Sequence, residues 1–124
     1  MTGNEYQQLA MRTNDGLNRL RLEDAIANQG DILVSQLLNG ALGLTGEAGE
    51  VSDLVKKGIF HEKGIDLEHL KKELGDCAWY LTMICDACGF TLDDVMQTNI
   101  DKLKARYPKG FDTYRANNRT EGDI

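Results

Sequence analysis

The fold of this chain is decided by the stretch Leu44-Thr45-Gly46-Glu47-Ala48-Gly49-Glu50-Val51, which is echoed further along by Leu70-Lys71-Lys72-Glu73-Leu74-Gly75-Asp76-Cys77. Both stretches have the form Leu-x-x-Glu-apolar-Gly-acid-apolar. Residues three and four apart share one face of a helix, so Glu47 and Glu73 each fall on an apolar stripe. The pattern therefore predicts two helices that each carry a carboxylate in the middle of a core-facing stripe.

A carboxylate on an apolar stripe needs a counter-charge, because burying a bare carboxylate costs several kcal/mol or more. The second acid of each pair, Glu50 or Asp76, flanks the first, and no equal set of Lys or Arg lies on the stripes. If the two helices face each other, four carboxylates converge. Oxygen ligands favour Mg²⁺, with Mn²⁺ as the second candidate. The alternative is two ordinary amphipathic helices whose acids border the core.

Length and composition bound the class of protein. The chain has 124 residues, one proline and 41% hydrophobic residues, which predicts one helical domain with a core of its own. The net charge of −6 argues against a partner that is a nucleic-acid polymer. No apolar run is long enough for a membrane span, and the first ten residues lack a signal sequence. With an odd count of three cysteines, we expect a cytoplasmic protein with no membrane partner.

Capping signals predict four helices. A first helix should open with the capping box Thr2-Gly3-Asn4-Glu5 and end near residue 12. A second should run from a cap at Asp31 to about residue 57. The third and fourth are bounded by Asp66 and Gly89, and by Thr91 and Pro108. Residues 13–30 are ambiguous, and the polar segment 112–124 should be frayed.

Four glycines spaced by three occur within the predicted second helix, at positions 40, 43, 46 and 49. Each costs about 1 kcal/mol relative to alanine. Either a neighbouring helix or a ligand approaches closely, or the helix bends near Gly43, and the sequence leaves both open.

The third and fourth helices carry further candidates. Leu74 belongs to the main apolar stripe of the third, whereas Trp79 points roughly opposite, either to a subunit interface or to a stacked base. On the fourth, the predicted core positions are Leu92, Met96, Ile100 and Leu103. Asn99, Lys102 and Arg106 follow one line at the edge of that stripe. They could hold phosphate oxygens, or they could be an ordinary solvated flank.

Together these residues resemble the signature of the MazG-like, all-α nucleoside triphosphate pyrophosphohydrolases. The resemblance covers about residues 42–111 and includes all four acids. It rests on Glu47-x-x-Glu50 followed by Glu73-x-x-Asp76, on Trp79-Tyr80-Leu81, and on Asn99-x-x-Lys102-Leu103-x-x-Arg106-Tyr107-Pro108-x-Gly110-Phe111.

The resemblance implies an all-α bundle of four to five helices that assembles as a homo-oligomer, a dimer or a tetramer. The implied reaction converts a nucleoside triphosphate to the monophosphate and pyrophosphate. The four acids would hold Mg²⁺ and carry catalysis. Asn99, Lys102, Arg106 and Tyr107 would contact the phosphates or the base side, and Trp79 is a further candidate for substrate binding. Glu50, the more exposed acid of the first pair, is the preferred general base.

The resulting domain organisation is a single domain, residues 1–124. It would consist of an N-terminal helix and variable segment (1–30), a catalytic helical core (31–111) and a polar tail (112–124).

Two other classes of protein compete with this interpretation. A carboxylate-bridged di-iron bundle requires Glu-x-x-His on paired helices, and neither His61 nor His69 occupies that position. A non-enzymatic helical interaction module could use Trp79 and the glycine run for a partner helix, and should bind no metal.

Overall fold

The computed structural model of the chain describes residues 1–120 and 122, and these are organised as helices without a β-strand. The predicted all-α class is confirmed. The elements in chain order are α1 (Gly3–Met11), α2 (Asn18–Asn28), α3 (Val34–Phe60), α4 (Leu67–Cys88), α5 (Leu92–Arg106) and α6 (Thr113–Asn117).

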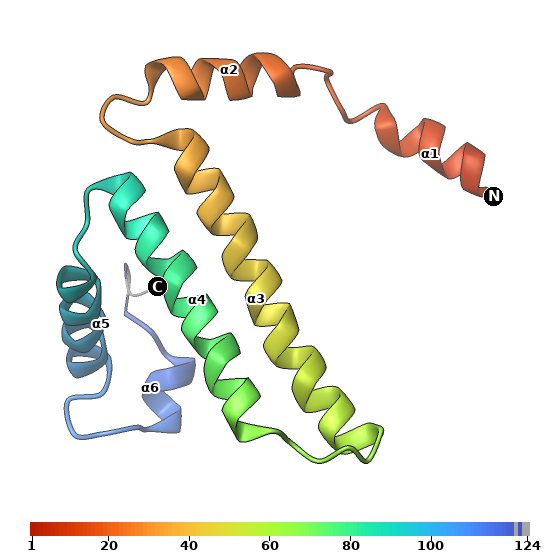
Figure 1. Cartoon of the computed structure of the whole chain (residues 1–124). Coiled ribbons are helices and arrows are strands. Elements are labelled where there is room, and N and C mark those ends of the chain that lie inside the picture. The colour runs from red at the N-terminus through yellow and green to blue at the C-terminus, as the bar shows by residue number, and fades with distance from the viewer. Residues whose placement is uncertain (121, 123–124) are drawn as a thin grey trace.

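The centre of the fold is an antiparallel hairpin of the two longest helices, α3 and α4 (Figure 1). Polar bonds fasten the start of α3 to the end of α4. The Gln36 side-chain amide donates to the Met83 carbonyl at 3.1 Å and to the Asp86 carboxylate at 2.7 Å. The backbone N–H of Leu33 donates to the Ala87 carbonyl at 2.9 Å. These bonds fix the register of the two helices.

The glycines of α3 explain how closely α4 approaches. A Cβ atom added at Gly43 would lie 2.2 Å from the ring of Tyr80, and one added at Gly40 would lie 2.8 Å from the Ile84 side chain. Helix α3 runs unbroken through both positions. Close approach of a neighbouring helix, rather than a bend, is therefore the reason for these two glycines. Gly46 and Gly49 differ, because a Cβ at either would meet nothing within 4 Å.

Most of the predicted helix ends are confirmed. The Thr2–Glu5 capping box is present at α1, and Asp66 caps α4 by accepting from the backbone N–H of His69 at 3.1 Å. Helix α4 ends at Gly89 in the left-handed conformation that favours glycine. The cap predicted at Asp31 is wrong. Helix α3 starts at Val34 after Leu33, without a side-chain cap, because the bond from Leu33 to Ala87 anchors the entering chain instead.

Two segments hold more structure than the sequence indicated. The ambiguous residues 13–30 contain α2, and the segment expected to be frayed contains α6, capped by Asp112. Of that tail, residues 121 and 123–124 lie outside the described part of the chain. None of the helices in the described residues combines the length and apolarity that crossing a bilayer requires.

The single chain has almost no interior of its own, contrary to the expected core. Among the described residues, Cys85 and Ala87 are the buried hydrophobic side chains. Predicted core residues such as Leu74, Met96 and Ile100 are about half exposed. The accessible surface is 10111 Å², whereas a compact monomer of this mass would expose about 6,600 Å². The prediction fails because most of the apolar stripe of α5, and Leu74 on α4, face open space within one chain.

Candidate metal centre

Three carboxylates meet between α3 and α4, at the middle of the hairpin. Glu47 comes from α3, and Glu73 and Asp76 come from α4. Each offers one oxygen atom, and these atoms all lie within 4.8 Å of one another. Glu47 stands one helical turn after Gly43, so the close packing on Tyr80 positions the acids across from each other. The two echoing stretches predicted that four carboxylates would converge, and three of them do.

The electrostatics of Glu47 show that the cluster lacks neutralising charge. Its pKa is raised, first by burial, and then by the charge of Asp76, the hydrogen bond with Glu73, and the charges of Glu73 and Glu50. None of the groups that shift this pKa is basic. Like charges this close favour either a bound proton or a bound cation. An all-oxygen donor set of this kind fits a hard divalent cation.

Glu50 has a different position from the other three acids. It is exposed on α3, one turn beyond Glu47, and its charge reaches Glu47. It is not part of the group whose oxygens lie within 4.8 Å of one another. Glu50 therefore borders the cluster on the solvent side.

His69 is a neighbour of the cluster that the sequence interpretation missed. Its Nε2 atom lies 2.9 Å from Oε1 of Glu73, and the Glu73 side chain is only 15% exposed. The spacing of His69 and Glu73 could have revealed the contact, because residues four apart on a helix are neighbours on its surface. The bond ties the buried carboxylate to the start of α4.

A hollow of about 390 Å³ adjoins the cluster where α3 ends and α4 begins. Glu50 and Glu73 line it together with Lys57, Lys63 and His69. Lys57 forms a 2.7 Å ion pair with Asp53. The hydrogen bond with Asp53, helped by the charges of Asp53 and Glu50, raises the pKa of Lys57, so it stays cationic. The sequence interpretation did not single out Lys57 or Lys63.

Trp79 lies one turn beyond Asp76 on α4 and is 57% exposed. Its ring meets that of Tyr80 edge to face, with centroids 5.0 Å apart. With Gln36 and Phe90, Trp79 lines a second hollow, of about 510 Å³. The tryptophan is thus next to the acids along the helix and lies outside their cluster.

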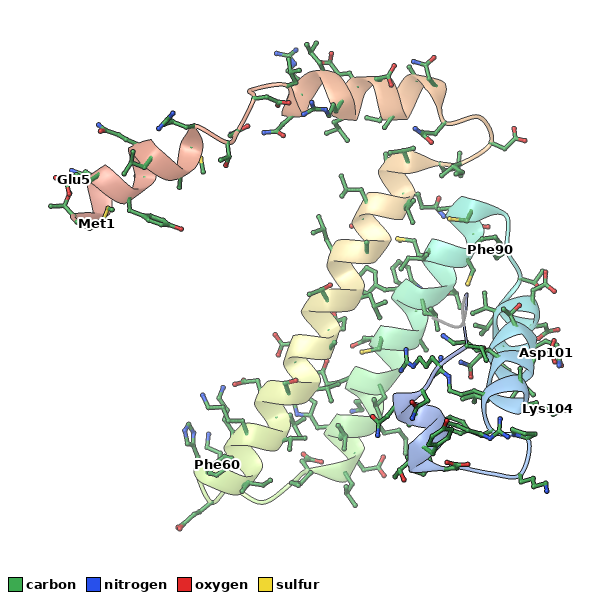
Figure 2. The ribbon with its side chains drawn as sticks, turned by 180° about the vertical axis from the view of Figure 1, so that it is seen from behind. Met1, Glu5, Phe60, Phe90, Asp101 and Lys104 are labelled. Atoms are coloured by element: carbon green, nitrogen blue, oxygen red, sulfur yellow. The ribbon has the colours of Figure 1, made fainter. Side chains whose placement is uncertain are left out.

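The candidates on α5 form a separate group. Figure 1 draws α5 on the side of α4 away from α3, and Figure 2 shows Asp101 and Lys104 on the outward side of α5. Asn99 and Lys102 are also exposed residues of α5. Arg106 lies over the ring of Tyr107, 5.9 Å from its centroid, and Tyr107 packs on Phe111. None of the groups that shift the pKa of Glu47 comes from this helix.

Comparisons with known proteins identify a family domain that includes the residues of the cluster. The profile described as "MazG nucleotide pyrophosphohydrolase domain" matches residues 30–111, which include α3, α4, α5 and all four acids. A protein of Mycobacterium phage L5, named only "Gene 37 protein", is 34% identical over 82 residues, covering 63% of this chain and 72% of that protein. No solved structure matches the chain significantly.

Proposed function

Because this chain belongs to the MazG nucleotide pyrophosphohydrolase family, we propose that it converts a nucleoside triphosphate and water into the monophosphate and pyrophosphate with a divalent metal ion. The observation that carries the proposal is the cluster of Glu47, Glu73 and Asp76. A triphosphate is itself strongly anionic, so these residues would repel it without a cation between them.

Glu47, Glu73 and Asp76, with Glu50 at the border, are the residues that would hold the ion. Mg²⁺ is the first candidate, because it accepts carboxylates together with waters and phosphate oxygens, and Mn²⁺ is the second. When bound, the ion supplies charge neutralisation at the phosphates and a bound water of lowered pKa. His69 would keep Glu73 oriented through its 2.9 Å bond.

Glu50 is the residue we assign to proton transfer from the attacking water. It is exposed, next to the cluster, and on the wall of the hollow that also contains Lys57 and Lys63. A carboxylate outside the closest group of acids is available to accept a proton. Lys57 and Lys63 could each contact a phosphate oxygen. The wall of the hollow also carries four carboxylates, so a phosphate would enter it only together with the metal ion.

The residues of α5 and Trp79 are assigned to the substrate as well. We propose that Asn99, Lys102, Arg106 and Tyr107 contact the phosphates or the base side, and that Trp79 offers its exposed ring to a base. Within one chain Asn99, Lys102, Arg106 and Tyr107 lie on or just after α5, away from the acid cluster, whereas Trp79 shares α4 with Glu73 and Asp76. Neighbouring copies in an oligomer would be able to bring them to the same substrate.

A homo-oligomer, a dimer or a tetramer, is the second part of the proposal. The accessible surface exceeds that of a compact monomer by about 3,500 Å², the difference between the two areas given above. Obligate homodimers bury about 2,000–5,000 Å² in total. Two copies of this chain therefore expose enough extra surface for an obligate interface.

The proposed reaction is tested by pyrophosphate release from a panel of canonical, deoxy and modified nucleoside triphosphates with Mg²⁺. Glu73→Gln and Asp76→Asn should abolish turnover while the circular-dichroism spectrum remains helical. Glu68→Gln is the matched control, because Glu68 lies exposed on the same helix and pairs with Lys71. Full Mg²⁺-dependent activity in either cluster variant would contradict the assignment.

Calorimetric titration with Mg²⁺ separates the enzyme from the competing interaction module. Binding that disappears in Glu47→Gln supports a metal centre at the cluster. Absence of binding in the wild-type protein would favour a module that works without metal.

A further inference from the structure

Residues 1–28, here called the N-terminal arm, lie outside the segment that matches the family profile. The arm consists of α1, α2 and the connector between them. In Figure 1 it crosses the start of α3 and extends on the side of α3 away from α4. Figure 2 places Met1 and Glu5 at its far end, away from the hairpin. Among the described residues no hydrogen bond or ion pair joins the arm to α3, α4 or α5.

The arm has a defined conformation, because hydrogen bonds and an ion pair within the connector and the start of α2 hold it. The Asp15 carboxylate accepts from the backbone N–H of Leu17 and forms an ion pair with Arg21. The Asn14 side chain accepts from the backbone N–H of Gly16 and from the Asn18 amide. These bonds fix how the connector enters α2.

Helix α1 nevertheless carries an apolar face that needs a partner. Tyr6 and Leu9 share that face and are 65% and 51% exposed, while Gln8 lies on the opposite face. Burying a Tyr or Leu side chain stabilises a complex by about 1.5–3 kcal/mol. An exposed apolar stripe on a well-capped helix is typical of a docking segment.

The reach of the arm identifies what it can cover. Helices of 11 and 9 residues are about 16 and 14 Å long, and packed helices lie about 8–10 Å apart. Because α2 and the connector lie between α3 and α1, α1 stands beyond any helix packed directly against α3 and can reach the next layer of a neighbouring copy. The excess surface of the chain is the area that a second copy would bury, so we take the second copy as the occupant.

We propose that the N-terminal arm clasps a second copy of the chain, with the face of α1 that carries Tyr6 and Leu9 packed against the surface of that copy. This inference rests on the homo-oligomer proposed above and is independent of the reaction. Each copy would contribute one arm and receive one arm.

The first test is a photo-cross-link with the full-length protein. A benzoylphenylalanine is placed at position 6, and copies labelled with ¹⁵N are refolded together with unlabelled ones. The expected product joins residue 6 of one isotopic form to a peptide of the other form. The same probe at position 8, on the opposite face of α1, should not form this product.

Two results would overturn the proposal: cross-links only between peptides of the same isotopic form, or no cross-link between protein segments. The wild-type mass from light scattering is measured first. A monomeric wild-type protein would contradict the homo-oligomer as well, whereas an oligomer without the expected cross-link contradicts the clasp alone.

The second test compares dissociation constants of Leu9→Ser and Gln8→Ser. Leu9→Ser should weaken self-association about tenfold or more, which corresponds to the loss of one buried apolar side chain. Gln8→Ser should leave it unchanged. Equal constants for Leu9→Ser and wild type would contradict the proposed contact. Pyrophosphate release, measured in parallel, reports separately on the reaction.

Discussion

At the scale of single residues, Glu47 couples the acid cluster to pH. Its folded-state pKa lies above the ordinary value of 4.5 because of burial and the neighbouring carboxylates. Above pH 4.5 the folded chain therefore holds this proton more tightly than the unfolded chain does. As pH rises through the raised pKa, this contribution to the free energy of unfolding falls.

We therefore expect Glu47→Gln to reduce the loss of stability with rising pH in metal-free protein. Urea unfolding of wild type and variant in a chelating buffer, at a series of pH values from about 4.5 upward, measures the difference. The lowered pKa of Asp53 changes the free energy of unfolding with pH in the opposite direction. Asp53 is present in both proteins, so its effect cancels in the comparison. Parallel curves for the two proteins would show that Glu47 does not titrate abnormally.

His69 yields a prediction about metal affinity. Removing a hydrogen-bond partner of a metal-binding carboxylate commonly weakens metal binding 10–100-fold. His69 is exposed, so we expect the low end, about tenfold, for His69→Ala in a calorimetric Mg²⁺ titration. His61→Ala is the control, because His61 lies in the loop after α3. An unchanged affinity in His69→Ala would mean that Glu73 keeps its orientation without this bond.

The residue scale is where the sequence was most informative and also incomplete. The two echoing acid pairs predicted that four carboxylates converge. Glu47, Glu73 and Asp76 do so, whereas Glu50 lies outside that group. The roles of the α5 residues stay predictions, because nothing in one chain places Asn99 or Lys102 against the acids. The hydrogen bond of His69 was overlooked, although its spacing from Glu73 allowed it.

At the scale of elements, the contact between Gly43 and Tyr80 sets the distance between α3 and α4. A Cβ at Gly43 would lie 2.2 Å from the ring, so one of the two helices would have to shift. We expect Gly43→Ala to destabilise the protein by about 1–3 kcal/mol, the usual cost of overpacking. Denaturant unfolding at fixed protein concentration is the measurement.

Gly46→Ala is the matched control on the same helix, one turn away. Its Cβ meets nothing within 4 Å in the chain, so it should gain about 1 kcal/mol of helix propensity. Equal stability of Gly43→Ala and wild type would disprove the tight contact. A loss in Gly46→Ala would instead indicate that another copy packs closely at this position.

Helix boundaries were predictable where a side chain marks them. Thr2, Asp66, Gly89 and Thr91 each have a local bonding role that sequence spacing reveals. The start of α3 was not predictable, because a backbone bond from Leu33 to the distant Ala87 replaces a side-chain cap. The role of the glycine run was also ambiguous, because it depends on a residue distant in the sequence. Gly43 is explained by its contact with Tyr80 on α4.

At the scale of the whole molecule, the exposed stripes make stability depend on assembly. Met96, Ile100 and Leu103 on α5 are 56%, 45% and 41% exposed in the single chain, so folding one copy alone gains little from them. A chain whose folded state requires a partner is stabilised by mass action. We expect the melting temperature to rise with protein concentration, measured by differential scanning calorimetry over a hundredfold range.

A melting temperature that does not change with concentration, together with a monomeric mass, would contradict the assembly. The sequence alone could not reveal this dependence. An apolar stripe has the same pattern whether it faces its own chain or another, so α5 was assigned to an internal core. Only the positions of α4 and α5 show that those side chains face outward.

The hairpin that gathers the acids also has a consequence for the order of folding events. Helices α3 and α4 are consecutive in the chain and joined by a short loop, and such local pairs close fast, before distant segments meet. Encounter between separate copies is a bimolecular step whose rate depends on how much protein has accumulated. A newly synthesised chain should thus present its three converging carboxylates to cellular cations while it is still alone, and stopped-flow refolding at increasing dilution should slow the late phase without changing the early one.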